Sequence, residues 1–208
     1  MTISSVAPAV PVGRLARRKA RTHEALLEAA TRVLAEKGLH ATKIVDIAAA
    51  ADVGVGTFYL HFPTKEALFA QLVSDTVARL EATCDAAQRG PGTPIERMRA
   101  ANLAFCRFAA ANREVFRIVF GHAGYDDVVR DAQAHFAATI AETLRDGVAA
   151  GDVASIDVAI AAQAVVGMVT QVLVWWLDHE SVSVEALHDA LMRLALDGLK
   201  GESDVRRR

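Results

Sequence analysis

Apolar residues recur along most of the chain at the three- and four-residue spacing of one helix face. The first such segment, residues 17–37, places Leu26, Ala30 and Val33 on a common face. Gly38 follows it, at the position where many helices end on a left-handed glycine. No segment shows the strict alternation expected of paired strands, so the pattern predicts an all-α fold of about nine helices.

Two short apolar segments come next and are joined by a tight turn at residues 51–54. Thr42 is placed to cap the first short helix, and Ile47 lies on its apolar face. The second runs over 56–62 and ends before Pro63, because proline cannot continue the helical hydrogen bonds. Two short helices packed across a longer one predict a helix-turn-helix, whose second short helix enters the major groove of DNA.

The remaining two-thirds of the chain predicts longer helices. Thr64 is placed to cap a fourth helix, and a Gly- and Pro-rich loop follows at 89–94. Further helices are expected near 94–120, 126–150, 156–179 and 184–200. The predicted organisation is a disordered arm over 1–16, a helix-turn-helix domain over 17–64, a helical domain over 65–201 and a frayed tail over 202–208.

Charge is distributed unevenly although the whole chain carries only −2. Residues 1–66 hold 9 Lys or Arg against 6 Asp or Glu, whereas residues 67–208 hold 14 against 19. Arg17 and Arg18 belong to a basic cluster within residues 14–21. A basic segment ahead of an acidic body is typical of a small nucleic-acid module, although charge alone is equally consistent with a solvated tail.

The residues of the predicted helix-turn-helix are more specific than its pattern. The segments GLHATKIVDIA (38–48) and VGVGTFYLHFPTKEAL (53–68) resemble the signature of the TetR family of transcriptional regulators, and the likeness extends over about 22–70. The resemblance implies an N-terminal DNA-binding domain followed by a helical ligand-binding and dimerisation domain. It also implies a homodimer on double-stranded, palindromic operator DNA that acts as a repressor and is released by a small-molecule effector. Activation in place of repression stays open.

The resemblance also implies roles for individual residues. Thr42 and Lys43 would contact phosphates, Tyr59 and His61 would contact phosphate or sugar, and Lys65 would hold a phosphate. With the two arginines of the basic cluster, the expected DNA-binding residues are Arg17, Arg18, Thr42, Lys43, Gly54, Val55, Gly56, Thr57, Tyr59, His61 and Lys65. His23, by contrast, is expected to be solvated.

Three positions depart from the usual family pattern. Asp52 stands where the family usually has glycine, and Gly54 stands where it has a hydroxyl cap. Val55 replaces a residue that is often a polar base reader. A valine offers only apolar contact, such as that with a thymine methyl.

Residues 158–177 contain no charge and are long enough to span a membrane. Asp157 and Asp178 flank the segment where a membrane anchor would carry basic residues. We therefore expect no membrane partner and a homodimer through the helices near 156–179 and 184–200, as the resemblance implies. The N-terminal residues lack the pattern of a secretory signal, so a cytoplasmic location is expected.

Large residues of the rear domain are the candidates for an effector pocket, although for any one of them plain core packing is the simpler interpretation. They are Phe105, Phe108, Phe116, Phe120, Phe136, Met168, Gln171 and Trp175. Without a cluster of charges among them, an apolar or aromatic effector is expected.

Other chemistry is not indicated by the sequence. Cys84 and Cys106 stand on apolar segments and predict buried, reduced thiols, with a redox-sensing pair as the alternative. The histidines lack metal-ligand spacing, so neither a metal nor a cofactor is expected. No catalytic triad, phosphate loop or carboxylate pair suggests an enzyme.

Overall fold

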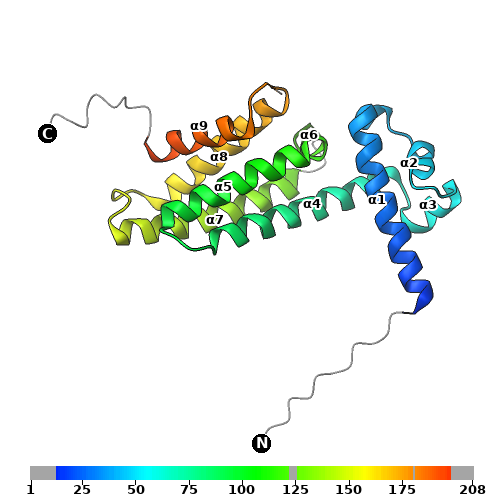
Figure 1. The fold of residues 1–208 in the computed structure, drawn as a ribbon, viewed down its shortest axis with the longest axis horizontal. Coiled ribbons are helices and arrows are strands. Elements are labelled where there is room, and N and C mark those ends of the chain that lie inside the picture. The colour runs from blue at the N-terminus through cyan, green and yellow to red at the C-terminus, as the bar shows by residue number, and fades with distance from the viewer. Residues whose placement is uncertain (1–12, 122–125, 180, 198–208) are drawn as a thin grey trace, which may run out of the picture. The chain divides into compact units, whose positions relative to one another are not determined.

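The computed structural model describes residues 13–121, 126–179 and 181–197. Within these residues the chain forms nine helices and no strand, which confirms the all-α prediction (Figure 1). The helices are α1 (Arg14–Ala41), α2 (Ile44–Ala50), α3 (Val55–His61), α4 (Lys65–Gln88), α5 (Pro94–Ala111), α6 (Arg113–Gly121), α7 (Asp126–Ala150), α8 (Val158–Leu177) and α9 (Val184–Leu196). Most of the predicted arm and the whole of the predicted tail lie outside the described residues.

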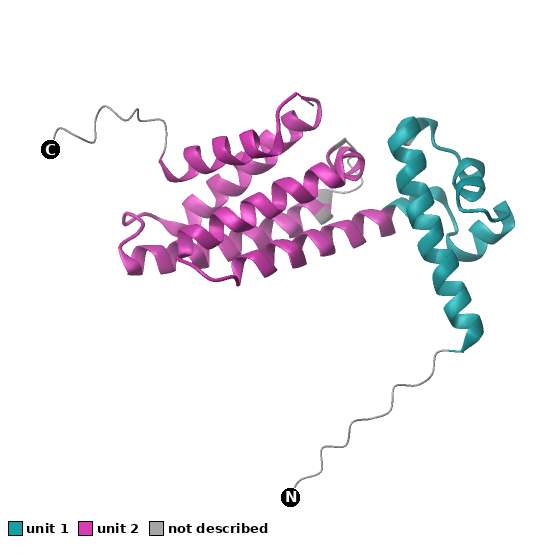
Figure 2. Cartoon of the chain, viewed as in Figure 1, with its two compact units in different colours: residues 1–69 teal, residues 70–208 magenta. Residues whose placement is uncertain are grey.

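The chain divides into two compact units, residues 1–69 and 70–208 (Figure 2). The division falls inside α4, five residues beyond the boundary expected after residue 64. The first turn of α4 belongs to unit 1, because the ammonium of Lys65 donates to the carbonyl oxygen of Thr42 at 3.1 Å. The same continuous helix then supplies residues of unit 2.

Unit 1 is built from α1, α2, α3 and the start of α4. Leu26, Ile47 and Phe58 are fully buried in it, and the rings of Phe58 and Phe62 lie 5.9 Å apart. Gly38 has the left-handed φ of 73° expected of a helix-ending glycine. The helical conformation resumes beyond it to residue 41, so α1 is kinked there and longer at both ends than the predicted 17–37.

Unit 2 contains the rest of α4 and helices α5 to α9. Within it α5 packs against α7 and α9, and α7 packs against α8. Side chains of Thr93, Asp157 and Ser183 accept backbone N–H groups and begin α5, α8 and α9. Trp176 of α8 is buried in the core and donates its indole N–H to the carbonyl of Val182 at 2.8 Å.

The prediction of a single helix over 94–120 is wrong, because α5 and α6 are separate helices divided at Asn112. The amide nitrogen of Asn112 donates to the carbonyl of Phe108 at 2.8 Å, and its amide oxygen accepts from Arg79 at 3.0 Å. Asparagine side chains that bond nearby backbone compete with the helical ladder. The apolar spacing continues through the break, so the pattern alone does not reveal it.

Candidate DNA-binding surface and ligand cavity

Helices α2 and α3 form the helix-turn-helix. Their directions differ by 97°, within the range of about 90–120° that is usual for this motif. Asp52, in the turn between them, has the left-handed φ of 54° that makes glycine common at such a position. Aspartate tolerates this conformation better than most residues, which explains how the turn forms without the family's glycine.

The exposed face of α3 is apolar and small. Val55 is 41% exposed, Tyr59 is 54% exposed, and Gly56 lies between them in the sequence on the open surface. A Cβ built at Gly54 or Gly56 would meet no described atom within 4 Å, chain neighbours aside. Packing within the described chain therefore does not require glycine at either position, and both leave the surface open to a close approach from outside. Thr57 is half-buried on the same helix.

Thr42 does not cap α2, because Lys43 occupies the N-cap position and donates its backbone N–H to Asp46 at 3.3 Å. The Thr42 side chain is 1% exposed and its hydroxyl donates to the carbonyl of Gly38 at 2.7 Å. This hydroxyl therefore closes the kink of α1 and does not face outward. Lys43 is exposed, whereas Lys65 is half-buried on the Thr42 carbonyl.

His61 is half-buried and turns one ring nitrogen inward. Its Nδ1 atom is buried without a hydrogen-bond partner among the described residues, and its ring lies 5.8 Å from that of His23. Burial, together with nearby His23 and Lys19, lowers the pKa of His61. His23 is half-buried and stacks on Phe62 at 4.5 Å, so the expectation that it is solvated is wrong. Its imidazole fills the gap beside the end of α3.

Exposed residues on α1 and α2 extend the candidate surface. The basic cluster at the start of α1, which includes Arg17 and Arg18, is exposed throughout. Val45 of α2 and Leu60 of α3 are also exposed, and the sequence analysis did not single them out. Their apolar character resembles that of core positions, so the pattern offered no signal for them.

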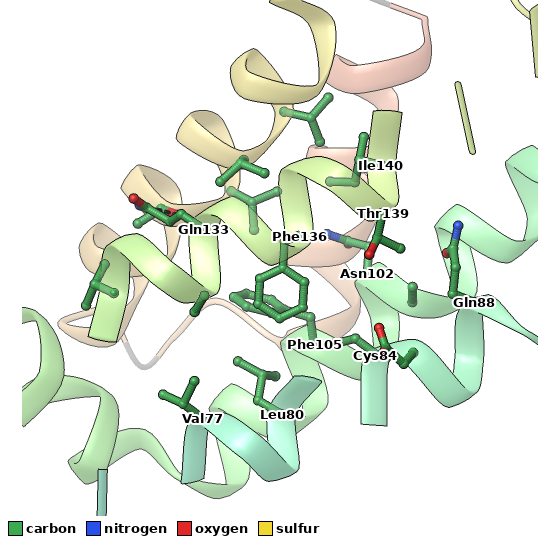
Figure 3. Close-up of a pocket in the computed structure, with 18 of the residues that line it drawn as sticks. Val77, Leu80, Cys84, Gln88, Asn102, Phe105, Gln133, Phe136, Thr139 and Ile140 are labelled. Carbon is green, nitrogen blue, oxygen red and sulfur yellow. Dashed lines mark hydrogen bonds between the residues drawn. The ribbon is translucent and has the colours of Figure 1, made fainter. Parts of the chain in front are cut away.

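Unit 2 contains a cavity of about 120 Å³ that is partly open to solvent (Figure 3). Helices α4 to α9 all contribute to its wall. The lining residues are Thr76, Val77, Leu80, Cys84, Asp85, Gln88, Met98, Ala101, Asn102, Phe105, Phe116, Val119, Phe120, Val129, Ala132, Gln133, Phe136, Thr139, Ile140, Val165, Val166, Val169, Thr170 and Met192.

The structure brings half of the expected pocket residues together. Phe105, Phe116, Phe120 and Phe136 line the cavity, and the Phe105 ring meets the rings of Phe116 and Phe136 edge to face. Phe108, Met168, Gln171 and Trp175 do not line it. Phe108 lies under Arg79, with the guanidinium 5.6 Å from the ring, and Met168 packs at the edge of the core. Gln171 and Trp175 are exposed on α8.

Polar side chains of the cavity wall were missed by sequence reasoning. Gln88 donates to Thr143 and Gln133 donates to Thr170, so both amides are held from neighbouring helices. Asn102 is only 9% exposed and stands four residues after Met98 on the apolar face of α5. An amide within an apolar helix face is the signal that could have identified it.

One charged residue lines the cavity among those that the structure describes. The carboxylate of Asp85 lies 3.1 Å from Nε2 of His135 and 3.9 Å from Arg89. Arg89 therefore balances part of this negative charge from within the protein, and no Lys or Arg lines the cavity among the described residues.

Both cysteines are free and buried, in agreement with the prediction. Burial raises the pKa of Cys84 and of Cys106 to about 12. A thiol with so high a pKa has very little thiolate at neutral pH, and the thiolate is the reactive form. The geometry therefore favours packing over redox sensing.

Helix α8 presents an unusual surface. It is long and apolar enough to cross a membrane, yet only 17% of its most apolar 18-residue window is buried within the described chain. Ile160, Gly167 and Trp175 are exposed and share one face with Ala164 and Gln171, at spacings of three or four residues. An apolar face of this kind requires either a partner or lipid to cover it.

Comparison with known proteins finds one family match in each unit. The model of "Bacterial regulatory proteins, tetR family" matches residues 26–72, and that of "Tetracyclin repressor-like, C-terminal domain" matches residues 91–199. The chain is 35% identical over 80 residues to the HTH-type transcriptional repressor DhaR of Mycobacterium sp. (strain GP1), covering 38% of this chain and 39% of DhaR. It is 32% identical over 98 residues to the repressor KstR of Mycolicibacterium smegmatis, covering 47% of each chain.

These matches span less than half the length of either relative. Among solved structures, FadR from Bacillus subtilis in complex with stearoyl-CoA superposes with a TM-score of 0.69 at 18% identity, covering 86% of this chain and 100% of FadR. That likeness shows the fold alone. The second family model spans more than half of the chain, and with the helix-turn-helix of unit 1 it shows that this protein belongs to the TetR family of DNA-binding transcriptional regulators.

Proposed function

We propose that the chain is a homodimeric repressor that binds a palindromic operator through α3 and is released when a small apolar or aromatic molecule enters the cavity of unit 2. The observation that carries this proposal is helix α4. Its first residues bond within unit 1 at Thr42, and its later residues, Thr76 to Gln88, line the cavity. A ligand that changes the position of this helix acts on an element shared with the DNA-binding unit.

Contact with DNA is assigned to three parts of unit 1. The exposed arginines of α1 and Lys43 supply positive charge for phosphates, which positions a protein without reading sequence. Val55 and Gly56 stand in the first turn of α3, the part of a recognition helix that contacts base edges. Tyr59 is exposed on the same helix and is assigned to the backbone. Thr42, His61 and Lys65 are less suitable than the resemblance implied, because each is wholly or partly engaged inside the protein.

Homodimerisation is assigned to the exposed faces of α8 and α9. Ile160 is 69% exposed and Trp175 is 49% exposed, and Leu194 of α9 is exposed as well. Gly167 has open space around its Cβ position, which permits a partner helix to approach closely. Pairing these faces between two copies would bury the apolar surface without a membrane and is consistent with a cytoplasmic regulator acting on DNA.

The names of the relatives support repression. DhaR and KstR are both described as transcriptional repressors. Release from DNA requires the ligand to prefer one state, and a nearly complete switch needs a preference of about 5 kcal/mol. Only contacts that the cavity makes better in one state than in the other contribute to this preference.

Dimerisation can be tested with the Gly167→Leu variant. A Cβ at this exposed position meets no described atom within 4 Å, so the monomer should fold while the dimer weakens. The matched control is Ala134→Leu, at an exposed position of α7. Light scattering should report a dimer for the control and a monomer for the Gly167 variant. A wild-type monomer at micromolar concentration would contradict the assignment.

Ligand response can be tested on an operator selected from random duplexes. Metabolite extracts would be screened for release of the bound duplex from the wild type and from Ala132→Phe, which fills the cavity. The control is Ala134→Phe, two residues further along the same helix and exposed. We expect the filled variant to bind DNA normally and resist release, while the control behaves as the wild type. Equal release from both variants would place the effector outside the cavity.

A further inference from the structure

Asn102 presents a hydrogen-bond donor at the cavity wall that bonds to no described group of the protein. Its oxygen Oδ1 accepts from the thiol of Cys106 at 3.7 Å and lies 2.8 Å from Nδ1 of His188. Burial lowers the pKa of His188, so its imidazole is neutral and can donate from Nδ1. With the thiol of Cys106 and the Nδ1–H tautomer of His188 as donors, the amide oxygen lies on their side and the amide nitrogen on the other.

The amide nitrogen Nδ2 has no hydrogen-bond partner within the described part of the chain. This distinguishes Asn102 from the other lining amides, because Gln88 and Gln133 donate to Thr143 and Thr170. In Figure 3 Asn102 and Thr139 lie to one side of Phe105 and Phe136, with Gln133 on the other side of these rings. A ligand in the cavity that carries an acceptor can bond this open N–H group, and a placed polar group of this kind fixes the orientation of a mainly apolar ligand.

The charge of the wall restricts the ligand further. Among the described lining residues Asp85 carries the one formal charge, and that charge is negative. A carboxylate or a phosphate entering this cavity would lose its water without meeting a cation, which costs more than apolar contacts restore. A neutral molecule carries no such penalty.

We propose that the cavity binds a neutral, mainly apolar molecule whose carbonyl or ether oxygen accepts a hydrogen bond from Nδ2 of Asn102. The inference rests on the proposed function only in taking the cavity as the effector site. A preference for a neutral ligand would distinguish this chain from an acyl-CoA sensor, although FadR of the same fold was solved with stearoyl-CoA.

The ligand side of the proposal is tested with the wild-type protein and a matched series of ten-carbon probes. The series comprises 2-decanone, decane, decanoate and decanoyl-CoA, and binding is measured directly by competition with a solvatochromic dye, without DNA. The ketone should bind about tenfold more tightly than the alkane, the value of one satisfied hydrogen bond, and more tightly than both anions. Stronger binding of decanoate or decanoyl-CoA would overturn the proposal, as would no binding of the ketone at its solubility limit.

The protein side is tested with Asn102→Leu, which keeps the branched shape of the side chain and removes the donor. The ketone should lose about tenfold in affinity and the alkane should be unaffected, whereas Gln133→Leu should leave the ketone-to-alkane ratio near the wild-type value. An unchanged ratio in Asn102→Leu would remove Asn102 from the site. If that variant does not fold, the ratio measured on the wild type still decides the proposal. Release of the operator is measured separately, so binding of the ketone without release would contradict the proposed function and leave this inference standing.

Discussion

Gly56 offers the sharpest separation of folding from DNA binding. The residue lies within α3, has no left-handed φ, and has open space where a Cβ would stand. Alanine is favoured over glycine inside a helix by about 1 kcal/mol. Gly56→Ala should therefore raise the free energy of unfolding of unit 1 by roughly 0.5–1 kcal/mol, measured by urea denaturation with far-ultraviolet circular dichroism.

DNA binding should change in the opposite direction. If the α3 backbone lies against the groove, a methyl group at residue 56 displaces the helix from it. Crowding of this kind costs about 1–3 kcal/mol, or roughly 5- to 150-fold in affinity for the selected operator. Fluorescence anisotropy of a labelled duplex measures the loss, and Gly56→Leu should bind more weakly still.

The control for stability is Ala35→Gly, at an exposed position of α1. It should lower the free energy of unfolding by about 1 kcal/mol and leave the affinity for the operator unchanged. If Gly56→Ala bound the operator as tightly as the wild type, the backbone of α3 would not approach DNA at this residue. The open space around Gly56 would then have no functional meaning.

Three further predictions concern the turn, an ion pair and the thiols. Asp52→Asn keeps a residue that tolerates the φ of 54° and removes a negative charge, so it should leave the free energy of unfolding in urea unchanged and tighten the operator complex at low salt. Asp52→Gly should tighten the complex in the same way and also raise the free energy of unfolding by up to about 1 kcal/mol. A hydrogen bond from Lys37 is the main cause that lowers the pKa of Asp46. The stabilising effect of this pair should therefore be present above pH ~4 and fade as the pH falls. In Lys37→Met an NMR titration should show the Asp46 pKa nearer its ordinary value. At pH 8, Cys84 and Cys106 should react with a thiol reagent only after the protein unfolds, and rapid labelling of the native protein would refute their burial. Because the pKa of both thiols is raised to about 12, the native state should also lose stability as the pH rises above ~9.

Local chemistry made much of unit 1 predictable. The glycine that kinks α1, the proline after α3 and the hydroxyl of Thr64, which accepts the Ala67 N–H at 3.1 Å, act within one turn of their own position. Effects of such short range can be predicted from the neighbouring residues alone. The break at Asn112 was missed because the apolar spacing continues through it, and one of the two bonds that hold the Asn112 side chain comes from Arg79, which is 33 positions away in the chain.

The candidate site was predictable only in outline for the same reason. Thr42 and His61 have side chains typical of phosphate contacts, but whether such a group faces outward depends on residues that pack against it from other helices. His23 lies 38 positions before His61 and sets its environment. Trp175 and Trp176 adjoin in sequence, and the helical turn of 100° between them sends one to the surface and the other into the core.

The two sides of helix α9 connect the cavity with the proposed dimer. His188 faces inward and fixes the orientation of Asn102, and Met192 lines the cavity, while Leu194 is exposed on the surface assigned to the partner. A ligand that bonds Asn102 therefore acts on the helix that would carry the interface. Coupling between two binding events is reciprocal, so a ligand that binds the dimer and the monomer unequally must change the dimer dissociation constant by a factor set by that preference, which acts at both sites of the dimer. Sedimentation with and without 2-decanone measures that factor, and an unchanged constant would show that release from DNA proceeds through α4 without the interface.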